Sequence, residues 1–246
     1  MENHSSKSDM REGVEQKELE ARLQAVLDHV GSACQKVGRS PDEVTLVAIS
    51  KKHPAQCIEM FAKAGQRAFG ESYVQEALEK QEVLEHLTPG VQWHFVGGLQ
   101  SNKAKLVAGK FSLIHSVDSI KLAQKISDKA LAFKQKQPIL LQVNIAGEEQ
   151  KSGAETSNAL SIAKTMLTLE GVELRGLMIL PPYCENAEDA RPYFKKLREL
   201  KEALEEDLRI SLPHLSMGMS HDYVQAVEEG ATLIRVGTAL FGPRPY

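Results

Sequence analysis

The sequence predicts a single parallel (β/α)₈ barrel, the TIM-barrel architecture. Eight apolar runs of strand length alternate with segments of helical periodicity along most of the chain, and this alternation is typical of parallel α/β folds. The length of 246 residues is also usual for a one-domain barrel. A doubly wound open sheet is the rival architecture, but it normally contains fewer strands.

The expected elements follow one another in a regular order. Residues 1–16 are polar and are expected to be a flexible N-terminus, whereas residues 17–246 are expected to form the barrel. A helical stripe from Leu19 to Ala33, which includes Leu27, comes first and ends at the turn-forming segment 37–41. The predicted strands are 44–50, 68–69, 92–96, 113–116, 139–144, 173–178, 214–216 and 232–236. The predicted helices between them are 55–64, 73–86, 102–108, 120–133, 157–169, 188–206 and 223–228.

Composition excludes several classes of protein. The formal net charge of −3 argues against general nucleic-acid binding, which needs clustered Lys and Arg to neutralise phosphates. Three scattered cysteines, Cys34, Cys57 and Cys184, are too few for a disulfide framework or a zinc site. The N-terminal residues contain no secretory signal, and no stretch approaches the ~20 apolar residues that span a bilayer. We therefore expect a cytoplasmic protein without a metal, nucleic-acid or membrane partner.

Two lysines follow the first predicted strand. If Thr45, Val47 and Ile49 face the barrel interior, the two-residue period of a strand places Lys51 on that face and Lys52 outside. Barrel chemistry gathers where strands end, and a partly desolvated lysine there can form a Schiff base with an aldehyde. Position alone, however, favours two ordinary solvated loop lysines.

Glycine and hydroxyl residues follow the last two predicted strands. Ser216-Met217-Gly218-Met219-Ser220 follows the seventh, and Gly237-Thr238 follows the eighth. Both segments offer hydroxyls and unhindered backbone N–H groups beside a helix start, which suits an anion. These two loops are also the usual phosphate position in such barrels. The absence of a Walker sequence and of G-x-G-x-x-G disfavours a nucleoside triphosphate or a dinucleotide.

Most of the other candidate residues near the strand ends have ordinary structural explanations, and Arg235 is the exception. Arg235 lies within the last predicted strand, where a buried arginine needs an ion-pair partner or a ligand, and the neighbouring anion loop favours a ligand. His94 alone is explained as a hydrogen-bonded core residue, and Met178 as core packing. Asn102 and Ser72 are explained as helix caps.

Taken together, these segments resemble the pyridoxal phosphate homeostasis protein family, the YggS/PROSC-type proteins that bind pyridoxal 5′-phosphate (PLP). They occur in the family's order and span nearly the whole chain from about residue 17. The matching segments are 48–51 (AISK), 69–76 (FGESYVQE), 93–97 (WHFVG), 99–103 (LQSNK), 175–178 (RGLM), 215–220 (LSMGMS) and 234–242 (IRVGTALFG).

The resemblance implies a barrel like the N-terminal domain of alanine racemase, a fold type III PLP protein, without that enzyme's second domain. It implies PLP held as an aldimine on Lys51, with Arg235 against the pyridine nitrogen. Where the family commonly has asparagine, this chain has Ser72, which can cap a helix but reaches less far. The other residues that the resemblance assigns to cofactor binding are His94, Asn102, Met178, Ser216, Met217, Gly218, Ser220, Gly237 and Thr238.

The function implied is a monomeric PLP carrier that supplies apo-enzymes, without robust turnover. An arginine stays charged and, unlike a carboxylate, cannot accept the proton of the pyridine nitrogen. The ring nitrogen then remains mostly unprotonated, and the ring is a poorer electron sink.

Two alternatives stay open. A PLP-dependent racemase-like enzyme would need a second proton carrier, for which Tyr73 and His94 are candidates. An aldolase-like barrel would use Lys51 on a carbonyl substrate without PLP.

Overall fold

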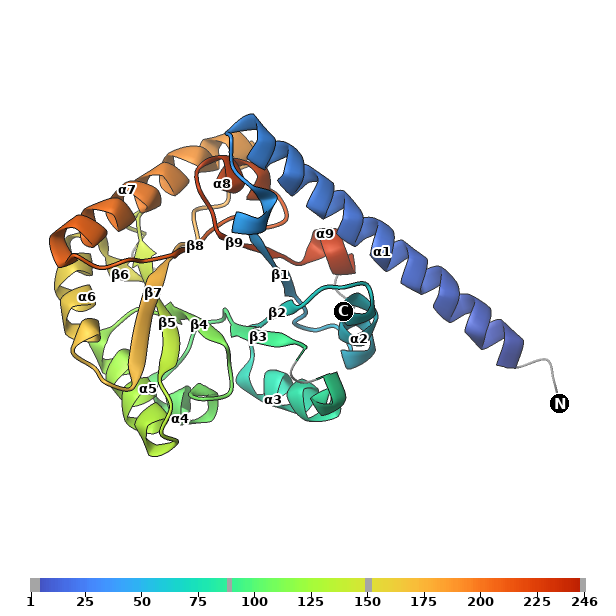
Figure 1. Cartoon of the computed structure of the whole chain (residues 1–246), viewed down its shortest axis with the longest axis horizontal. Helices are drawn as coiled ribbons and strands as arrows, with labels where there is room; N and C mark the ends of the chain where they lie inside the picture. The colour runs from blue at the N-terminus through green and yellow to red at the C-terminus, as the bar shows by residue number, and fades with distance from the viewer. Residues whose placement is uncertain (1–4, 88–89, 149–151, 244–246) are drawn as a thin grey trace.

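Eight parallel strands pair in a closed ring in the computed structural model, which describes residues 5–87, 90–148 and 152–243 (Figure 1). The ring closes where the last strand pairs with the first, so the predicted parallel barrel is confirmed. A two-residue strand, β6 (Ala154–Glu155), adds to the carboxyl end of one barrel strand and was not expected. The barrel strands are β1 (Thr45–Ile49), β2 (Ala68–Glu71), β3 (Gln92–Phe95), β4 (Leu113–Val117), β5 (Gln137–Asn144), β7 (Val172–Met178), β8 (His214–Ser216) and β9 (Leu233–Val236).

Helices surround this ring (Figure 1). The α-helices are α1 (Ser5–Lys36), α2 (Ala55–Lys63), α3 (Val74–Val83), α4 (Ala104–Val107), α5 (Ile120–Ala132), α6 (Ala159–Leu167), α7 (Arg191–Leu208), α8 (Tyr223–Glu228) and α9 (Thr238–Phe241). Short 3₁₀ helices are η1 (Pro41–Glu43), η2 (Glu85–Leu87), η3 (Ser101–Lys103), η4 (Thr156–Asn158) and η5 (Ala187–Ala190). In the described part of the chain, no helix has the length and apolar character needed to cross a membrane.

The strands alternate their side chains between two apolar layers. One cluster fills the barrel interior, and Ile49 packs against it. Leu46 and Ala48 of β1 belong instead to the larger cluster between the strands and the helices. Thr45, expected inside, is exposed where β1 begins. The interior cluster consists of Val47, Ala68, Leu113, Leu140, Met178 and Leu233.

Helix α1 packs across the first and last parts of the barrel, against α2, α8 and α9 (Figure 1). Its buried stripe runs from Leu19 to Ala33, as the sequence predicts. Leu27 is 42% exposed, because it lies about 100° around the helix from the buried Val26. The helix begins at Ser5. Whether residues 1–16 are flexible is not tested by the fold, and the flexible N-terminus stays a prediction. Residues 1–4 lie outside the described residues.

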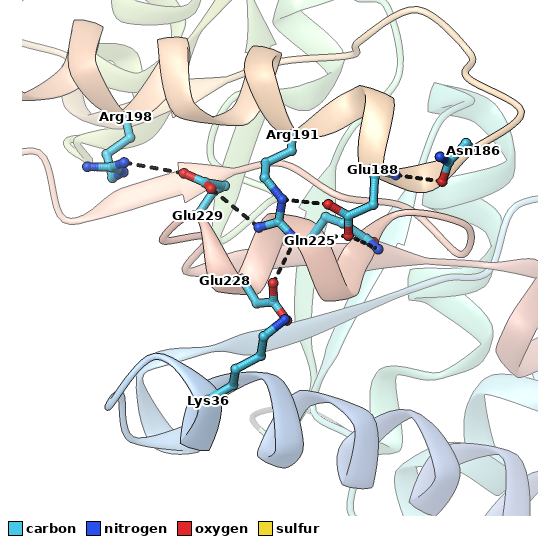
Figure 2. A network of polar contacts seen from close by, with 8 residues as sticks. All are labelled: Lys36, Asn186, Glu188, Arg191, Arg198, Gln225, Glu228 and Glu229. Carbon is cyan, nitrogen blue, oxygen red and sulfur yellow. Dashed lines mark hydrogen bonds and ion pairs between the residues drawn. The ribbon is translucent and has the colours of Figure 1, made fainter.

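A network of charged side chains joins α7 and α8 to η5 and α1 (Figure 2). At its centre, Arg191 binds Glu188 at 2.8 Å, Glu228 at 2.7 Å and Glu229 at 3.3 Å. Lys36 of α1 binds the other oxygen of Glu228 at 2.8 Å. The network therefore holds α8, which follows the loop after β8, against two neighbouring helices.

We predict that Glu188→Gln lowers stability only where the carboxylate is ionised. The hydrogen bonds from Arg191 and Gln225 lower the pKa of Glu188 from 4.5 to about 2. A carboxylate with a lowered folded-state pKa stabilises the protein above its unfolded pKa, and this contribution is lost as the pH falls towards the folded value. The difference in unfolding free energy between wild type and Glu188→Gln should thus be constant above about pH 5 and should shrink from there towards pH 2.

Urea unfolding at a series of pH values measures this difference. The control is Glu199→Gln on the neighbouring helix α7. Glu199 lies 3.8 Å from Lys195 in a surface pair, which contributes little, whereas Glu188 accepts hydrogen bonds from both Arg191 and Gln225. A difference that persisted unchanged down to the lowest pH would contradict the prediction.

Candidate functional site

A cavity of about 790 Å³ lies at the carboxyl end of the strands. Its lining comes from the ends of β1 and β9 and from segments that follow β1, β2, β3, β7, β8 and β9. This is the end of the barrel at which the sequence predicts chemistry. The lining is composed of Ile49, Lys51, His53, Ser72, Tyr73, Val74, Gln75, Val96, Gly97, Gly98, Gln100, Lys103, Leu180, Met219, Ser220, His221, Arg235, Gly237, Thr238 and Gly242.

Of the residues that the family resemblance assigns to cofactor binding, half line this cavity and half lie outside its lining. Met178 belongs to the interior cluster, and Met217 is fully buried in the outer one. Asn102 lies in η3 between two lining residues, Gln100 and Lys103. The assigned residues in the lining are Lys51, Ser72, Ser220, Arg235, Gly237 and Thr238. The assigned residues outside it are His94, Asn102, Met178, Ser216, Met217 and Gly218.

The sequence interpretation missed several polar residues of the lining. Gln75, Gln100 and Lys103 reach the cavity from the segments after β2 and β3, and His221 reaches it from the loop after β8. Their place shortly after a predicted strand was the available signal. Nothing in their spacing told which of them point inward.

Lys51 reaches the cavity from a tight turn. The turn spans residues 50–53 and is closed by the hydrogen bond from the His53 N–H to the Ser50 carbonyl, at 3.1 Å. Lys51 is half-buried and lines the cavity, whereas Lys52 is exposed. Lys51 therefore lies at the cavity and Lys52 outside its lining, although both belong to a turn beyond the end of β1 and not to the strand on which the prediction rested.

Arg235 lies on β9 in the cavity wall and is almost completely buried. Its guanidinium donates hydrogen bonds to the Ser216 hydroxyl at 2.6 Å and to the Ile179 carbonyl at 2.8 Å. Burial lowers the pKa of Arg235 to about 10, partly opposed by Asp222. The side chain is consequently a fixed positive charge at neutral pH.

Two buried histidines continue the hydrogen bonding from Ser216. His115 Nδ1 lies 2.8 Å from the Ser216 hydroxyl oxygen, and His115 Nε2 lies 2.9 Å from His94 Nδ1. Burial lowers the pKa of His115 well below its ordinary value and that of His94 to about 4. Both rings are thus neutral at pH 7, and His94 is the hydrogen-bonded core residue that its sequence context indicates.

One continuous chain of hydrogen bonds links Arg235, Ser216, His115 and His94. Ser216 accepts from Arg235 and is hydrogen-bonded to His115 Nδ1, and His115 Nε2 is hydrogen-bonded to His94 Nδ1. The far nitrogen of His94, Nε2, has no hydrogen-bond partner among the described residues. The chain therefore fixes the orientation of Arg235 from behind the cavity.

The loops after β8 and β9 are joined at the cavity. The Ser220 hydroxyl accepts hydrogen bonds from the backbone N–H groups of Gly237 at 3.2 Å and Ala239 at 3.3 Å. Gly237 and Thr238 start the short helix α9 and line the cavity together with Ser220. The two segments that the sequence proposes as an anion cradle thus form one continuous wall.

Gly97 and Ser72 are in close contact at the opposite wall. A Cβ placed on Gly97 would lie 2.1 Å from the Ser72 carbonyl oxygen, far inside van der Waals contact. The Val96 N–H also donates to the Glu71 carbonyl at 2.8 Å. The loops after β2 and β3 can approach this closely only because residue 97 has no side chain.

Comparison with known proteins places these features in a family context. The family described as "Alanine racemase, N-terminal domain" matches residues 11–245. The pyridoxal phosphate homeostasis protein of Aquifex aeolicus is 46% identical over 225 residues, which cover 92% of this chain and 98% of that protein. The one of Escherichia coli K12 is 40% identical over 228 residues, covering 91% and 96%.

Solved structures agree with this similarity. PipY of Synechococcus elongatus with PLP bound has a TM-score of 0.80 at 37% identity, covering 91% of this chain and 100% of its own. Alanine racemase of Clostridium difficile has a TM-score of 0.69 at 12% identity, covering 92% of this chain and 58% of its own. At that identity, the second likeness shows the fold alone.

We predict that Gly97→Ala destabilises the protein more than Gly98→Ala does. The new methyl group would force the Ser72 loop away, and overpacking of this kind costs about 1–3 kcal/mol. At Gly98, no atom lies within 4 Å of the corresponding position. Urea unfolding of the two variants measures the difference, and equal stabilities would contradict the close contact.

We also predict that His94 remains neutral in the folded protein down to about pH 5. Its folded pKa of about 4 lies below the ordinary value of 6.5. The unfolded chain therefore binds the proton first, and the contribution of His94 to stability falls as the pH decreases from 6.5 to 4. Ring resonances followed by NMR test this directly, and a titration midpoint near 6.5 would exclude the buried chain.

Proposed function

Since this chain belongs to the family of pyridoxal phosphate homeostasis proteins, we propose that it binds PLP in the cavity and holds it for transfer to apo-enzymes. The observation that supports the proposal is the set of groups that line one cavity. Lys51, Arg235 and the joined loops at Ser220 and Gly237 supply an amine, a fixed positive charge and an anion wall. PLP carries a matching aldehyde, pyridine nitrogen and phosphate.

Each of these residues suits one part of the cofactor. PLP supplies an electrophilic aldehyde and an electron-accepting ring. Lys51 and Lys103 both line the cavity, and in our proposal the Lys51 amine, next to the end of β1, attaches the aldehyde covalently. The Ser220 hydroxyl, which accepts from the N–H groups of Gly237 and Ala239, and the Thr238 hydroxyl can each donate a hydrogen bond to a phosphate. Arg235 can face the pyridine nitrogen as a hydrogen-bond donor.

The remaining assigned residues support these groups in our proposal. Ser216 and His94 hold Arg235 through the hydrogen-bonded chain, and Met178 closes the barrel beneath the cavity. Met217 and Gly218 shape the loop after β8, where the Gly218 carbonyl accepts from the Arg235 N–H at 2.9 Å. Ser72 lines the cavity, and Asn102 flanks it.

The charge of Arg235 supports a carrier rather than an enzyme. With its pKa at about 10, Arg235 is protonated at neutral pH and can only donate to the ring nitrogen, which disfavours a proton on that nitrogen. A ring without that proton stabilises carbanions poorly. The curated relatives are likewise named homeostasis proteins. We propose that the chain acts as a monomer in this role.

A racemase-like activity would need a proton carrier in the cavity opposite Lys51. Of the two candidates, His94 lies outside the cavity lining, with its pKa lowered to about 4. Tyr73 lines the cavity and is 49% exposed. Robust amino-acid turnover by the pure protein, lost in Tyr73→Phe with PLP retained, would contradict the carrier proposal.

Absorbance spectroscopy of the purified protein with added PLP tests the attachment. We expect a visible band, and after borohydride reduction a PLP adduct on the peptide that contains Lys51. Lys51→Ala should abolish both, because it removes the amine. Lys52→Gln is the matched control and should retain both, since Lys52 is exposed and outside the cavity lining. A wild-type protein that stays colourless and carries no adduct would refute PLP binding.

A further inference from the structure

The turn that carries Lys51 contains an unfavourable backbone conformation. Lys51 and Lys52 occupy its two central positions, and Lys52 has a φ of 63°. This is the left-handed region, which residues with a Cβ rarely adopt. The turn therefore needs contacts from outside to hold its shape.

A buried lysine on α3 supplies such contacts. Lys80 is 7% exposed, and its ammonium group donates to the Ser50 carbonyl, Glu71 Oε1 and Glu76 Oε1, each at 2.7 Å. An ammonium group has three hydrogens, so these three acceptors use its full capacity. One of them is the backbone of the turn itself.

Both carboxylates bound by Lys80 also bind the turn. The Ser50 hydroxyl donates to Glu71 Oε1 at 2.7 Å, and the Lys52 N–H donates to Glu76 Oε1 at 2.5 Å. The contacts thus lie on either side of Lys51 in the chain. Ser50 hydrogen-bonds to the Glu71 carboxylate and to the Lys80 ammonium group of α3, whereas Lys51 lines the cavity. The cluster holds the turn from the helix side and leaves the Lys51 amine facing the cavity.

Stability alone does not account for this cluster. A buried ion pair loses hydration, and the attraction between its charges often does no more than compensate that loss. One oxygen of Glu71 has no hydrogen-bond partner among the described residues, and burial raises the pKa of Glu71 despite Lys80. Its contacts are concentrated on the backbone that flanks Lys51, which indicates a role in the geometry of that turn.

We propose that Lys80 and Glu76 are positioning residues, which hold the Lys51 turn in its left-handed conformation before PLP arrives. The inference rests on the proposed function in one respect, namely that Lys51 is the attachment point. A turn fixed in advance avoids the entropy loss of ordering it during the reaction. Loosening it should slow the attachment of PLP without removing the site.

Glu76 gives the cleanest test, because Lys80→Ala would leave the buried Glu71 carboxylate unpaired and endanger folding. Glu76→Ala removes the acceptor of the Lys52 N–H. Glu76→Gln restores an acceptor oxygen in the same place without the charge. Glu79→Ala is the matched control, since Glu79 lies on the same helix, is exposed and accepts a hydrogen bond from Gln75 on its own helix.

The first readout needs no PLP. Hydrogen exchange of the Lys52 amide in the full chain should be about tenfold faster in Glu76→Ala, as loss of a charged hydrogen-bond acceptor implies. It should return close to the wild-type rate in Glu76→Gln and remain there in Glu79→Ala. The amide of Val47 in β1 serves as an internal reference and should exchange equally in all four proteins.

The second readout is the rate at which the absorbance band of bound PLP grows after mixing. We expect it to be about tenfold slower in Glu76→Ala, with rescue in Glu76→Gln. Wild-type rates for both readouts in Glu76→Ala would overturn the inference and leave PLP binding untouched. An equal effect of Glu79→Ala would overturn it as well. If wild type attaches no PLP, the proposed function fails, whereas the exchange of the Lys52 amide still reports on the turn.

Discussion

The pairing of β9 with β1 is the interaction on which the cavity depends. It closes the ring and sets Val47 beside Arg235 in register, although these residues are far apart in the sequence. The Lys51 turn follows β1, and the Gly237-Thr238 wall follows β9. Because both segments leave their strands at the same end of the ring, Lys51 and the Gly237-Thr238 segment converge on one cavity. An open sheet with the same strands would place them at opposite edges.

The barrel interior is apolar in one layer and polar next to the cavity. Apolar side chains such as Val47, Leu113 and Leu233 form a dry cluster, whereas Arg235 and the histidine chain bring buried polar groups next to the cavity. Buried polar groups are tolerated when their hydrogen bonds are satisfied, and here nearly every donor on the chain has an acceptor. The orphaned Nε2 of His94 is the exception in the described residues.

Much of the fold was predictable from the sequence, and part of the site was too. The alternation of apolar runs with helical segments predicted the eight barrel strands. Lys51 lines the cavity as predicted, but its direction is set by the turn after β1 and not by the strand period. The contact between His94 and His115 was not predictable, because it depends on the register in which His94 pairs with Leu113 across β3 and β4. The role of Lys80 was not predictable either, since nothing near it in the sequence reveals that a turn from another segment covers it. Long-range contacts between polar side chains carry no periodic signal.

The position of α1 affects how the chain is made. This helix is synthesised before the barrel strands, yet it packs against α8 and α9, which are synthesised after most of them. Likewise, β1 can pair with β2 soon after both are made, but receives β9 only after the other barrel strands have been synthesised. A nascent chain must therefore keep an apolar helix face and an open strand edge from associating with other molecules until α8, β9 and α9 are available. Such a barrel therefore needs protection during synthesis, although both surfaces are covered in the folded protein.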